Sequence, residues 1–472
     1  MNAVLMQKKD ADSGSGKAGF RKTLSALTAL RNGFSQSGRK LLRHVLPMLD
    51  RDNPARPVSN SSTVRELAAA LLSTRGEAAG VAIATDLLNL YAQLDAGDRL
   101  KFFEMLASDF DPDERALVAS WEKFRSEGPT ALPQLFNVVE APRQELFRRL
   151  NLAPGGTAAL VRMREDLLAL KRDLVSLERV DFDLKHLLQS WFNRGFLKMQ
   201  SIDWSSPASL LELLIRYEAV HDITSWSDLR RRLAPTDRRC FAFFHPVMPD
   251  EPLIFVEVGL TIGIPDNIQD MLAADRVPIE PALATTATFY SINNCQRGLA
   301  GISFGHFLIK QVAADLKREL PGLDCFVTLS PLPGLMKWLR ETEKPEHDQA
   351  LVEALGTPEG FAALDKGSAQ SFLLQHAVTY LTQTRDAVGK PRDPVARFHL
   401  GNGARLERLN WAADTSINGL RQSGGIMVNY LYDLAHLEEN HEAFVEQGQV
   451  VTGEPFDTLL NATVRQSAKG QI

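Results

Sequence analysis

The most constraining feature of this chain is the stretch of residues 284–339, whose pattern predicts strand, glycine-rich loop, helix, strand, turn and helix. Residues 285–292 are rich in β-branched and aromatic side chains, which is typical of a strand. Beyond the loop, apolar residues recur at a spacing of four and predict one face of a helix packed on a sheet. These residues are Phe304, Leu308, Val312, Leu316 and Leu320.

The loop between this strand and this helix is where a ligand is expected. A glycine-rich turn that opens a helix leaves backbone N–H groups unpaired at the positive end of the helix dipole, and a phosphate fits there. Arg297 would add a charge-assisted contact. The loop lacks both the Gly-Lys-Ser/Thr of a P-loop and the G-x-G-x-x-G dinucleotide spacing. A tight turn without any ligand remains the alternative.

Several motifs, in order between residues 180 and 434, resemble the malonyl-CoA decarboxylase family. The resemblance implies an acetyltransferase-like fold, conversion of malonyl-CoA to acetyl-CoA and CO2 in fatty acid metabolism, and subunits assembled through N-terminal helices. The motifs are residues 183–188, 190–193, 297–301, 307–310, 329–334, 337–339, 398–400, 402–404 and 427–430.

Length and composition limit the alternatives. The chain has 472 residues, of which 44% are hydrophobic, so it can form more than one core. A formal net charge of −5 argues against a nucleic-acid partner. Three cysteines without metal-like spacing indicate a reducing compartment, and no apolar run has the length of a membrane span. We therefore expect a cytoplasmic protein that is not attached to a membrane.

The N-terminal region is predicted to be helical and to assemble subunits. We expect residues 1–16 to be disordered and residues 17–180 to form a helical oligomerisation domain, giving a dimer or tetramer. Thr63 and Glu66 have the spacing of a capping box, which marks the start of a helix. Between Leu160 and Leu177, leucines and Met163 recur at alternating intervals of three and four residues, as in a helix packed along a neighbour. A closed bundle is the alternative. Residues 17–49 contain several lysines and arginines but no aspartate or glutamate, which is compatible either with a targeting segment or with a solvated helix.

Residues 181–472 are predicted to form the catalytic domain. Apolar runs at 239–244, 253–261, 325–330 and 397–411 predict strands, with helices between them. The predicted fold class is therefore α plus α/β, an N-terminal helical bundle followed by a mixed α/β domain, and the resemblance implies that this second domain is acetyltransferase-like.

Coenzyme A is expected along the glycine loop, with its pyrophosphate at the helix N-terminus. Ser303 is a departure, since some members of the family have glutamate there, and Cys295 and His306 are expected to have no catalytic role. The predicted substrate-binding residues are Arg297, Gly298, Leu299, Ala300, Gly301, Ile302, Ser303, Phe304, Gly305 and His306.

Decarboxylation of a malonyl thioester leaves an enolate, which requires hydrogen-bond donors at its oxygen and a proton for C2. The thioester itself accepts the electrons, so no metal and no cofactor are expected; coenzyme A is part of the substrate. His399, at the end of a predicted strand, is the candidate acid because histidine titrates closest to neutrality. A structural histidine is the alternative, and the resemblance implies the catalytic role.

Ser330 precedes a Pro-Leu-Pro-Gly turn, so a helix N-cap is the alternative to catalysis. The resemblance implies that Ser330 is the partner of His399. Tyr432 is the preferred third residue, although it is as compatible with a packed core, and Asn410 and Tyr430 are further candidates. Two rival functions remain: an acyltransferase that needs an acceptor, and a sensor that binds malonyl-CoA without consuming it.

Overall fold

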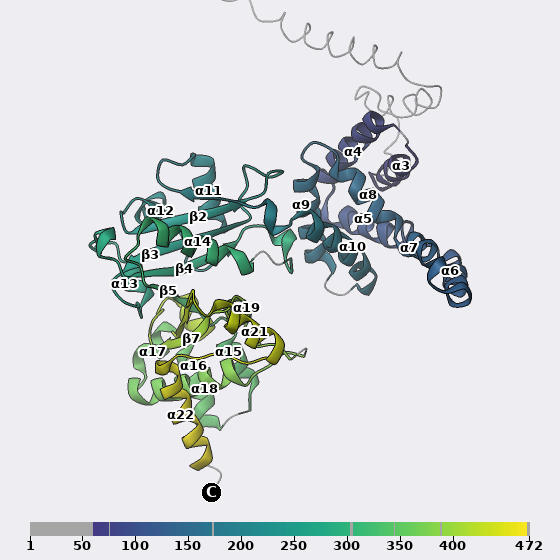
Figure 1. Cartoon of the computed structure of the whole chain (residues 1–472). Coiled ribbons are helices and arrows are strands. Elements are labelled where there is room, and N and C mark those ends of the chain that lie inside the picture. The colour runs from purple at the N-terminus through teal and green to yellow at the C-terminus, as the bar shows by residue number, and fades with distance from the viewer. Residues whose placement is uncertain are drawn as a thin grey trace, which may run out of the picture. The chain divides into compact units, whose positions relative to one another are not determined.

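The structure is a computed structural model that describes residues 60–469 apart from residues 75, 172–173, 303–304, 344 and 388. Two compact units make up the chain, Met1–Gly156 and Thr157–Ile472 (Figure 1). The predictions for residues 1–16 and 17–49 lie outside the described residues. No helix in the described part of the chain is long and apolar enough to cross a membrane.

The described part of the first unit is helical. Helices α3, α4, α5 and α8 pack together around buried side chains such as Leu87, Phe103 and Leu146. Thr63 lies inside α3, so the predicted capping box is wrong. The helices are α3 (Asn60–Ser73), α4 (Glu77–Ala92), α5 (Ala96–Ser108), α6 (Glu114–Glu127), α7 (Leu132–Val139) and α8 (Pro142–Asn151).

The apolar spacing between Leu160 and Leu177 belongs to two helices, α9 (Gly156–Leu170) and α10 (Val175–Trp191), and the prediction of one helix is wrong. Extended backbone at Leu174, with φ −122° and ψ 94°, interrupts the helical path. The periodicity continues across the break because both helices bury their apolar faces. The predicted domain boundary at residue 180 lies within α10, and the compact units divide earlier, after Gly156.

A mixed sheet forms the centre of the second unit, in the order β1-β2-β3-β4-β5-β8-β6, with β7 paired to β8. All pairs are antiparallel except β4 with β5, which α14 connects. The strands are β1 (Lys198–Ile202), β2 (Arg238–Phe244), β3 (Ile254–Thr261), β4 (Thr286–Asn294), β5 (Cys325–Thr328), β6 (Ser330–Pro331), β7 (Arg405–Asn410) and β8 (Met427–Leu431).

Helices surround this sheet, and together with the helical first unit they confirm the predicted fold class. The strands predicted at 239–244 and 253–261 are present as β2 and β3, whereas the edge strand β1 was not predicted because most of its side chains are polar or exposed. The helices are α11 (Ala208–Tyr217), α12 (Trp226–Leu233), α13 (Ile268–Leu272), α14 (Gly305–Glu319), α15 (Leu335–Glu341), α16 (Glu346–Leu355), α17 (Pro358–Ala363), α18 (Lys366–Thr382), α19 (Pro394–Gly401), α20 (Ile417–Ser423), α21 (Leu437–Gln447) and α22 (Glu454–Lys469).

The register of β3 and β4 separates two faces of the sheet. Glu257 is paired with Ser291, so both side chains lie on one face, whereas the next pair, Val258 with Phe289, points to the other. Tyr290 has no residue opposite it and forms a β-bulge. The face of Glu257 is covered by α11 and α12, and α14 is tied to the other face through its Glu319.

Candidate active site

Ser330 is the first residue of β6 and follows β5, the strand that pairs in parallel with β4, after one intervening residue. The backbone N–H of Leu329 donates to the Phe289 carbonyl at 3.0 Å, and Ser330 then pairs with Val428 of β8. Its side chain is buried, with 7% of the residue exposed. The N-cap position of the following helix α15 is occupied by Gly334, so the alternative reading of Ser330 as a helix cap is wrong.

His399 is in the last turn of helix α19, and the prediction of a strand at this position is wrong. Asp393 decides the local structure, because its Oδ1 accepts the backbone N–H groups of Val395 at 3.0 Å and Ala396 at 2.9 Å. Pro394 occupies the first helical turn, where its fixed φ is favourable. The short helix holds His399 in the interior with 3% of the residue exposed.

Tyr432, His399 and Ser330 form one chain of hydrogen bonds. The Tyr432 hydroxyl lies 2.7 Å from His399 Nδ1, and His399 Nε2 lies 3.1 Å from Ser330 Oγ. Ser330 Oγ in turn donates to Thr328 Oγ1 at 3.0 Å. Because the Ser330 hydroxyl proton is donated to Thr328, Ser330 Oγ accepts from His399 Nε2–H. His399 Nδ1 then carries no proton and accepts from the Tyr432 hydroxyl. The structure thus brings together all three residues predicted as catalytic.

The side chains of this hydrogen-bond chain are electrically neutral. Burial lowers the pKa of His399 to about 3, and no charge on a neighbouring residue adds to this effect. Burial also raises the pKa of Tyr432 well above its ordinary value. Both side chains are therefore uncharged at pH 7, and His399 does not titrate near neutrality as its residue type suggests.

The two other candidates differ in their positions. Tyr430 stacks on His399 with ring centroids 4.6 Å apart, and its buried hydroxyl has no hydrogen-bond partner in the described structure. Asn410 instead donates its side-chain N–H to Asn429 Oδ1 at 2.8 Å. Tyr430 is thus in contact with the predicted acid, whereas the observed bond of Asn410 goes to β8.

Asp393 also connects the two segments that carry Ser330 and His399, a role that sequence reasoning did not find. Its Oδ2 accepts the backbone N–H of Gly334, at the end of the turn after Ser330, at 3.4 Å. The Tyr380 hydroxyl bonds the same carboxylate, and a Cβ at Gly334 would lie 2.1 Å from that hydroxyl. The only sequence signal is Asp-Pro at the start of a helix.

The predicted coenzyme A loop begins as a short 3-10 turn, Arg297–Leu299, and the predicted helix is present as α14, which starts at Gly305. Arg297, Ala300 and Gly301 are exposed, whereas Leu299 and Ile302 are buried and use their side chains for packing. The predicted contacts by Ser303 and Phe304 lie outside the described residues, as does the side chain of His306.

Strand β4 connects this loop to the Ser330–His399–Tyr432 chain. Phe289, in the middle of β4, lies with its ring centroid 6.4 Å from that of Tyr432. The end of the same strand, at Asn294, leads directly into the loop.

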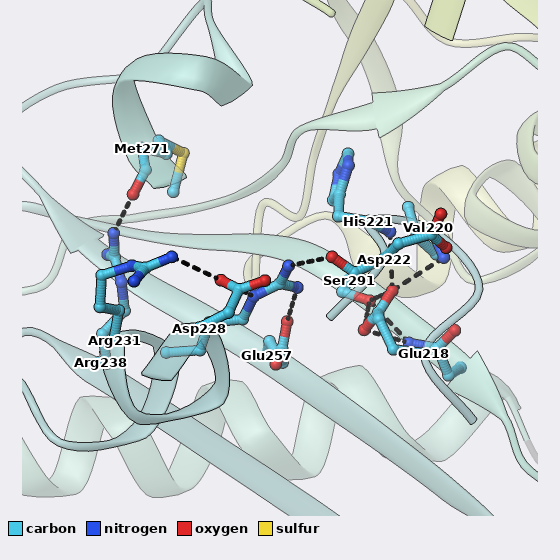
Figure 2. A network of polar contacts seen from close by, with 12 residues as sticks. Glu218, Val220, His221, Asp222, Asp228, Arg231, Arg238, Glu257, Met271 and Ser291 are labelled. Atoms are coloured by element: carbon cyan, nitrogen blue, oxygen red, sulfur yellow. Dashed lines mark hydrogen bonds and ion pairs between the residues drawn. The ribbon is translucent and has the colours of Figure 1, made fainter. Parts of the chain in front are cut away.

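A second buried polar cluster lies on the other face of the sheet (Figure 2). Glu218 accepts hydrogen bonds from Ser291 Oγ at 2.8 Å and Asn293 Nδ2 at 2.9 Å, while Arg232 forms an ion pair with Glu257 at 3.3 Å. Burial, aided by the charge of Glu218, raises the pKa of Glu257 to about 8. These contacts hold α11 and α12 against β3 and β4.

Solved structures with this architecture define the class of the protein. The crystal structure of malonyl-CoA decarboxylase from Rhodopseudomonas palustris is 52% identical, covers 85% of this chain and 99% of its own, and has a TM-score of 0.81. That from Agrobacterium vitis is 49% identical, with coverage of 84% and 99% and a TM-score of 0.78. The chain is a decarboxylase, a carboxy-lyase.

Sequence comparisons identify the family. The malonyl-CoA decarboxylase C-terminal domain model matches residues 195–470, and the N-terminal domain model matches residues 110–192. The mitochondrial malonyl-CoA decarboxylase of Anser anser anser is 34% identical over 404 residues, which is 76% of this chain and 79% of the relative. That of Rattus norvegicus is 34% identical over 349 residues, 67% of this chain and 70% of the relative. This chain belongs to the malonyl-CoA decarboxylase family.

Proposed function

We propose that this chain converts malonyl-CoA to acetyl-CoA and CO2, with Ser330, His399 and Tyr432 as its catalytic residues. The observation that carries the proposal is the continuous hydrogen-bond chain, 2.7 Å from Tyr432 to His399 and 3.1 Å from His399 to Ser330. Within the described structure no carboxylate is bonded to His399, as it would be in a hydrolase triad. The arrangement favours donating protons over activating a serine nucleophile.

In the proposed reaction the bond between C2 and the carboxyl carbon breaks, and CO2 leaves. The electron pair of that bond moves onto the thioester as an enolate, whose oxygen carries the negative charge. The Ser330 hydroxyl lies on a rigid segment between β5 and α15 and is placed to donate to this oxygen. A preorganised donor of this kind typically contributes about two to three powers of ten in rate.

The proton for C2 would come from His399. Because burial alone keeps His399 neutral, a carboxylate brought beside it raises its pKa and lets it take up a proton with the substrate. When CO2 has left, the N–H bond breaks, a C–H bond forms at C2, and the imidazole returns to its neutral state. Tyr432 holds the ring in place through Nδ1 throughout.

The glycine loop is the proposed site for the phosphates of coenzyme A. Its exposed part, with Arg297 and Gly301, precedes the N-terminus of α14, where helix polarity favours an anion. No metal or other cofactor is needed in this scheme, because the thioester carbonyl accepts the electron pair. The remaining predicted contacts between residues 297 and 306 belong to the same proposal.

The test is to incubate the purified protein with malonyl-CoA alone and to measure acetyl-CoA and CO2. We expect equal amounts of both products, one deuterium in the product methyl group when the reaction runs in D2O, and losses of about a hundredfold or more in kcat for His399→Ala and Ser330→Ala. His347→Ala, at an exposed position on α16, is the control and should retain wild-type kcat.

Other outcomes would favour the rival functions. Turnover that begins only when an amine acceptor is added would indicate an acyltransferase, which transfers the acyl group and releases no CO2. Binding of malonyl-CoA without any product would indicate a sensor. If either variant keeps wild-type activity, the residue concerned is not catalytic.

We also propose that the chain forms a homo-oligomer through its N-terminal helices. Helix α7 buries none of its residues and α6 buries only Ser120. Large apolar side chains are exposed on both, including Trp121 at 48% and Phe136 at 66%. A second copy covering this surface would remove these side chains from water.

Sedimentation of the Trp121→Ser/Phe136→Ser double variant tests this assembly. We expect a smaller mass than for the wild type, whereas Val445→Ser, at an exposed apolar site on α21, should leave the mass unchanged. An unchanged mass in the double variant would exclude this surface as the interface. A cytoplasmic location remains part of the proposal, supported by the free thiols of all three cysteines.

A further inference from the structure

The glycine loop contacts the helix pair α9–α10, which precedes the sheet in the sequence. Arg164 of α9 donates to the Gly298 carbonyl at 2.7 Å and to the Ala300 carbonyl at 2.9 Å. Its Nε donates to Asp181 of α10 at 2.8 Å. Gly298 packs so closely on α9 that a Cβ there would lie 1.9 Å from the Val161 carbonyl oxygen. The guanidinium of Arg164 is therefore used to shape the loop.

Lys185 of α10 lies beside the exposed end of the same loop. A Cβ at Gly301 would lie 3.1 Å from Lys185 Nζ and 3.4 Å from its Cε, so the ammonium group stands directly against this residue. Gly301 has a left-handed φ of 74° and is exposed. The Lys185 ammonium group therefore lies next to the solvent-exposed backbone of the loop at Gly301.

This ammonium group has no counter-ion in the described structure. Lys171, the residue after α9, forms an ion pair with Asp181, and Lys310 of α14 forms one with Glu438. Lys185 makes neither an ion pair nor a hydrogen bond with a described residue. Its side chain is nevertheless half-buried. Partial burial of an unpaired charge is unfavourable, and a bound anion would offset that cost.

We propose that Lys185 binds the pyrophosphate of coenzyme A, so that a residue of the helical region before the sheet completes the phosphate site. The inference rests on the proposed position of coenzyme A along the loop. Lys185 Nζ lies against Gly301, on the exposed part of the loop to which the phosphates are assigned, four positions before the first residue of α14. Lysine suits this role because its ammonium acts as a point charge toward phosphate oxygens.

The experiment compares three thioesters that share the malonyl group. Malonyl-CoA has the pyrophosphate and the 3′-phosphate, malonyl-dephospho-CoA lacks the 3′-phosphate, and malonyl-pantetheine lacks both. For Lys185→Ala we expect kcat/KM to fall about tenfold to a hundredfold with the first two substrates, the range of a lost charge-assisted hydrogen bond. The loss should appear in KM, with kcat nearly unchanged.

With malonyl-pantetheine the difference between Lys185→Ala and the wild type should shrink to less than about twofold, because the group that Lys185 binds is missing. Lys185→Arg, which keeps the charge, should recover most of the affinity. Lys366→Ala, at an exposed position at the start of α18, is the control for loss of a positive charge.

Two results would overturn the proposal. An equal loss with malonyl-pantetheine would assign Lys185 a structural role, and a loss confined to malonyl-CoA would assign it to the 3′-phosphate instead. Calorimetric binding of free coenzyme A to the wild type and to Lys185→Ala separates this inference from the proposed function. Weaker binding in the variant supports Lys185 even if the protein turns over none of the three thioesters.

Discussion

The two faces of the sheet bury polar groups of different kinds. On the face of Glu257, charged side chains are held by opposite charges or by several donors: Arg232 pairs with Glu257, and Glu218 accepts bonds from Ser291 and Asn293. On the other face, Ser330, His399 and Tyr432 are neutral, and the side-chain hydrogen bonds that they make with described residues go to one another and to Thr328.

This difference indicates which buried groups can change their hydrogen-bond partners when a substrate binds. Separating a buried ion pair leaves an uncompensated charge, so such a network is fixed in one arrangement. A chain of neutral donors and acceptors can exchange one partner for a substrate oxygen at a much smaller cost. We therefore expect variants on the face of Glu257 to change stability, and variants on the face of His399 to change catalysis.

The largest effect is expected for Arg232→Ala. The substitution removes the partner of the fully buried Glu257, and at pH 8.5, above its pKa of about 8, the ionised carboxylate is left without a counter-ion, which should lower the free energy of unfolding by about 3 to 5 kcal/mol. Urea unfolding measures this loss, while kcat per folded molecule should stay within about twofold of the wild type. Arg231→Ala, on the exposed side of the same helix, should cost less than about 1 kcal/mol.

Asp393→Ala should affect both properties, because Asp393 caps α19 and contacts the turn after Ser330. Loss of the cap and of the bond from Tyr380 should cost about 2 to 4 kcal/mol in unfolding and reduce kcat about tenfold. Asp393→Asn, which keeps one side-chain oxygen for the cap, should recover at least half of the stability. A kcat that stays at the wild-type value in the alanine variant would show that the two segments keep their positions without this carboxylate.

Tyr432→Phe tests the neutral face directly. Removing the hydroxyl deprives His399 Nδ1 of its partner, so kcat should fall about tenfold to a hundredfold while unfolding changes by only about 1 kcal/mol. Tyr430→Phe is the matched control, because it keeps the ring stacked on His399 and removes a hydroxyl that has no partner in the described structure. Equal kcat values for the two variants would contradict the proposed role of Tyr432.

For Glu257→Gln the expected effect is smallest at pH 5 and grows as the pH rises. The folded-state pKa of Glu257 is about 8, above the ordinary value of 4.5, so the folded protein binds this proton more tightly than the unfolded chain. The wild type should therefore lose stability relative to the glutamine variant as the pH rises from about 4.5 to 8. Urea titrations at pH 5, 7 and 8.5 measure this difference, and a constant difference would show that Glu257 is ionised throughout.

Sequence reasoning reached the fold and the three candidate catalytic residues by different routes. The strand, loop and helix around Gly301 are specified locally, by β-branched residues, glycines and a spacing of four. Ser330, His399 and Tyr432 came from a resemblance in motifs, and the structure places them in hydrogen-bond contact.

Other features were wrong or absent in the prediction, for identifiable reasons. The strand expected at His399 is a helix because Asp393 and Pro394 start one, and these two residues outweigh the apolar pattern that follows. Thr63 was read as a cap although α3 begins at Asn60. The supports of the glycine loop, Arg164 and Lys185, lie more than a hundred positions before it in the chain, and periodicity gives no indication of such contacts.

The sequence by itself determined the order of elements in this protein, the glycine loop before α14 and the motifs that mark its family, because these depend on neighbouring residues and on residue type. Only the tertiary structure decided that His399 is neutral and bonded on both sides, and that Arg232 and Glu257 pair on the other face of the sheet. The physical reason is that burial and hydrogen-bond partners set a pKa. Those partners come from distant segments, since His399 and Ser330 are 69 positions apart.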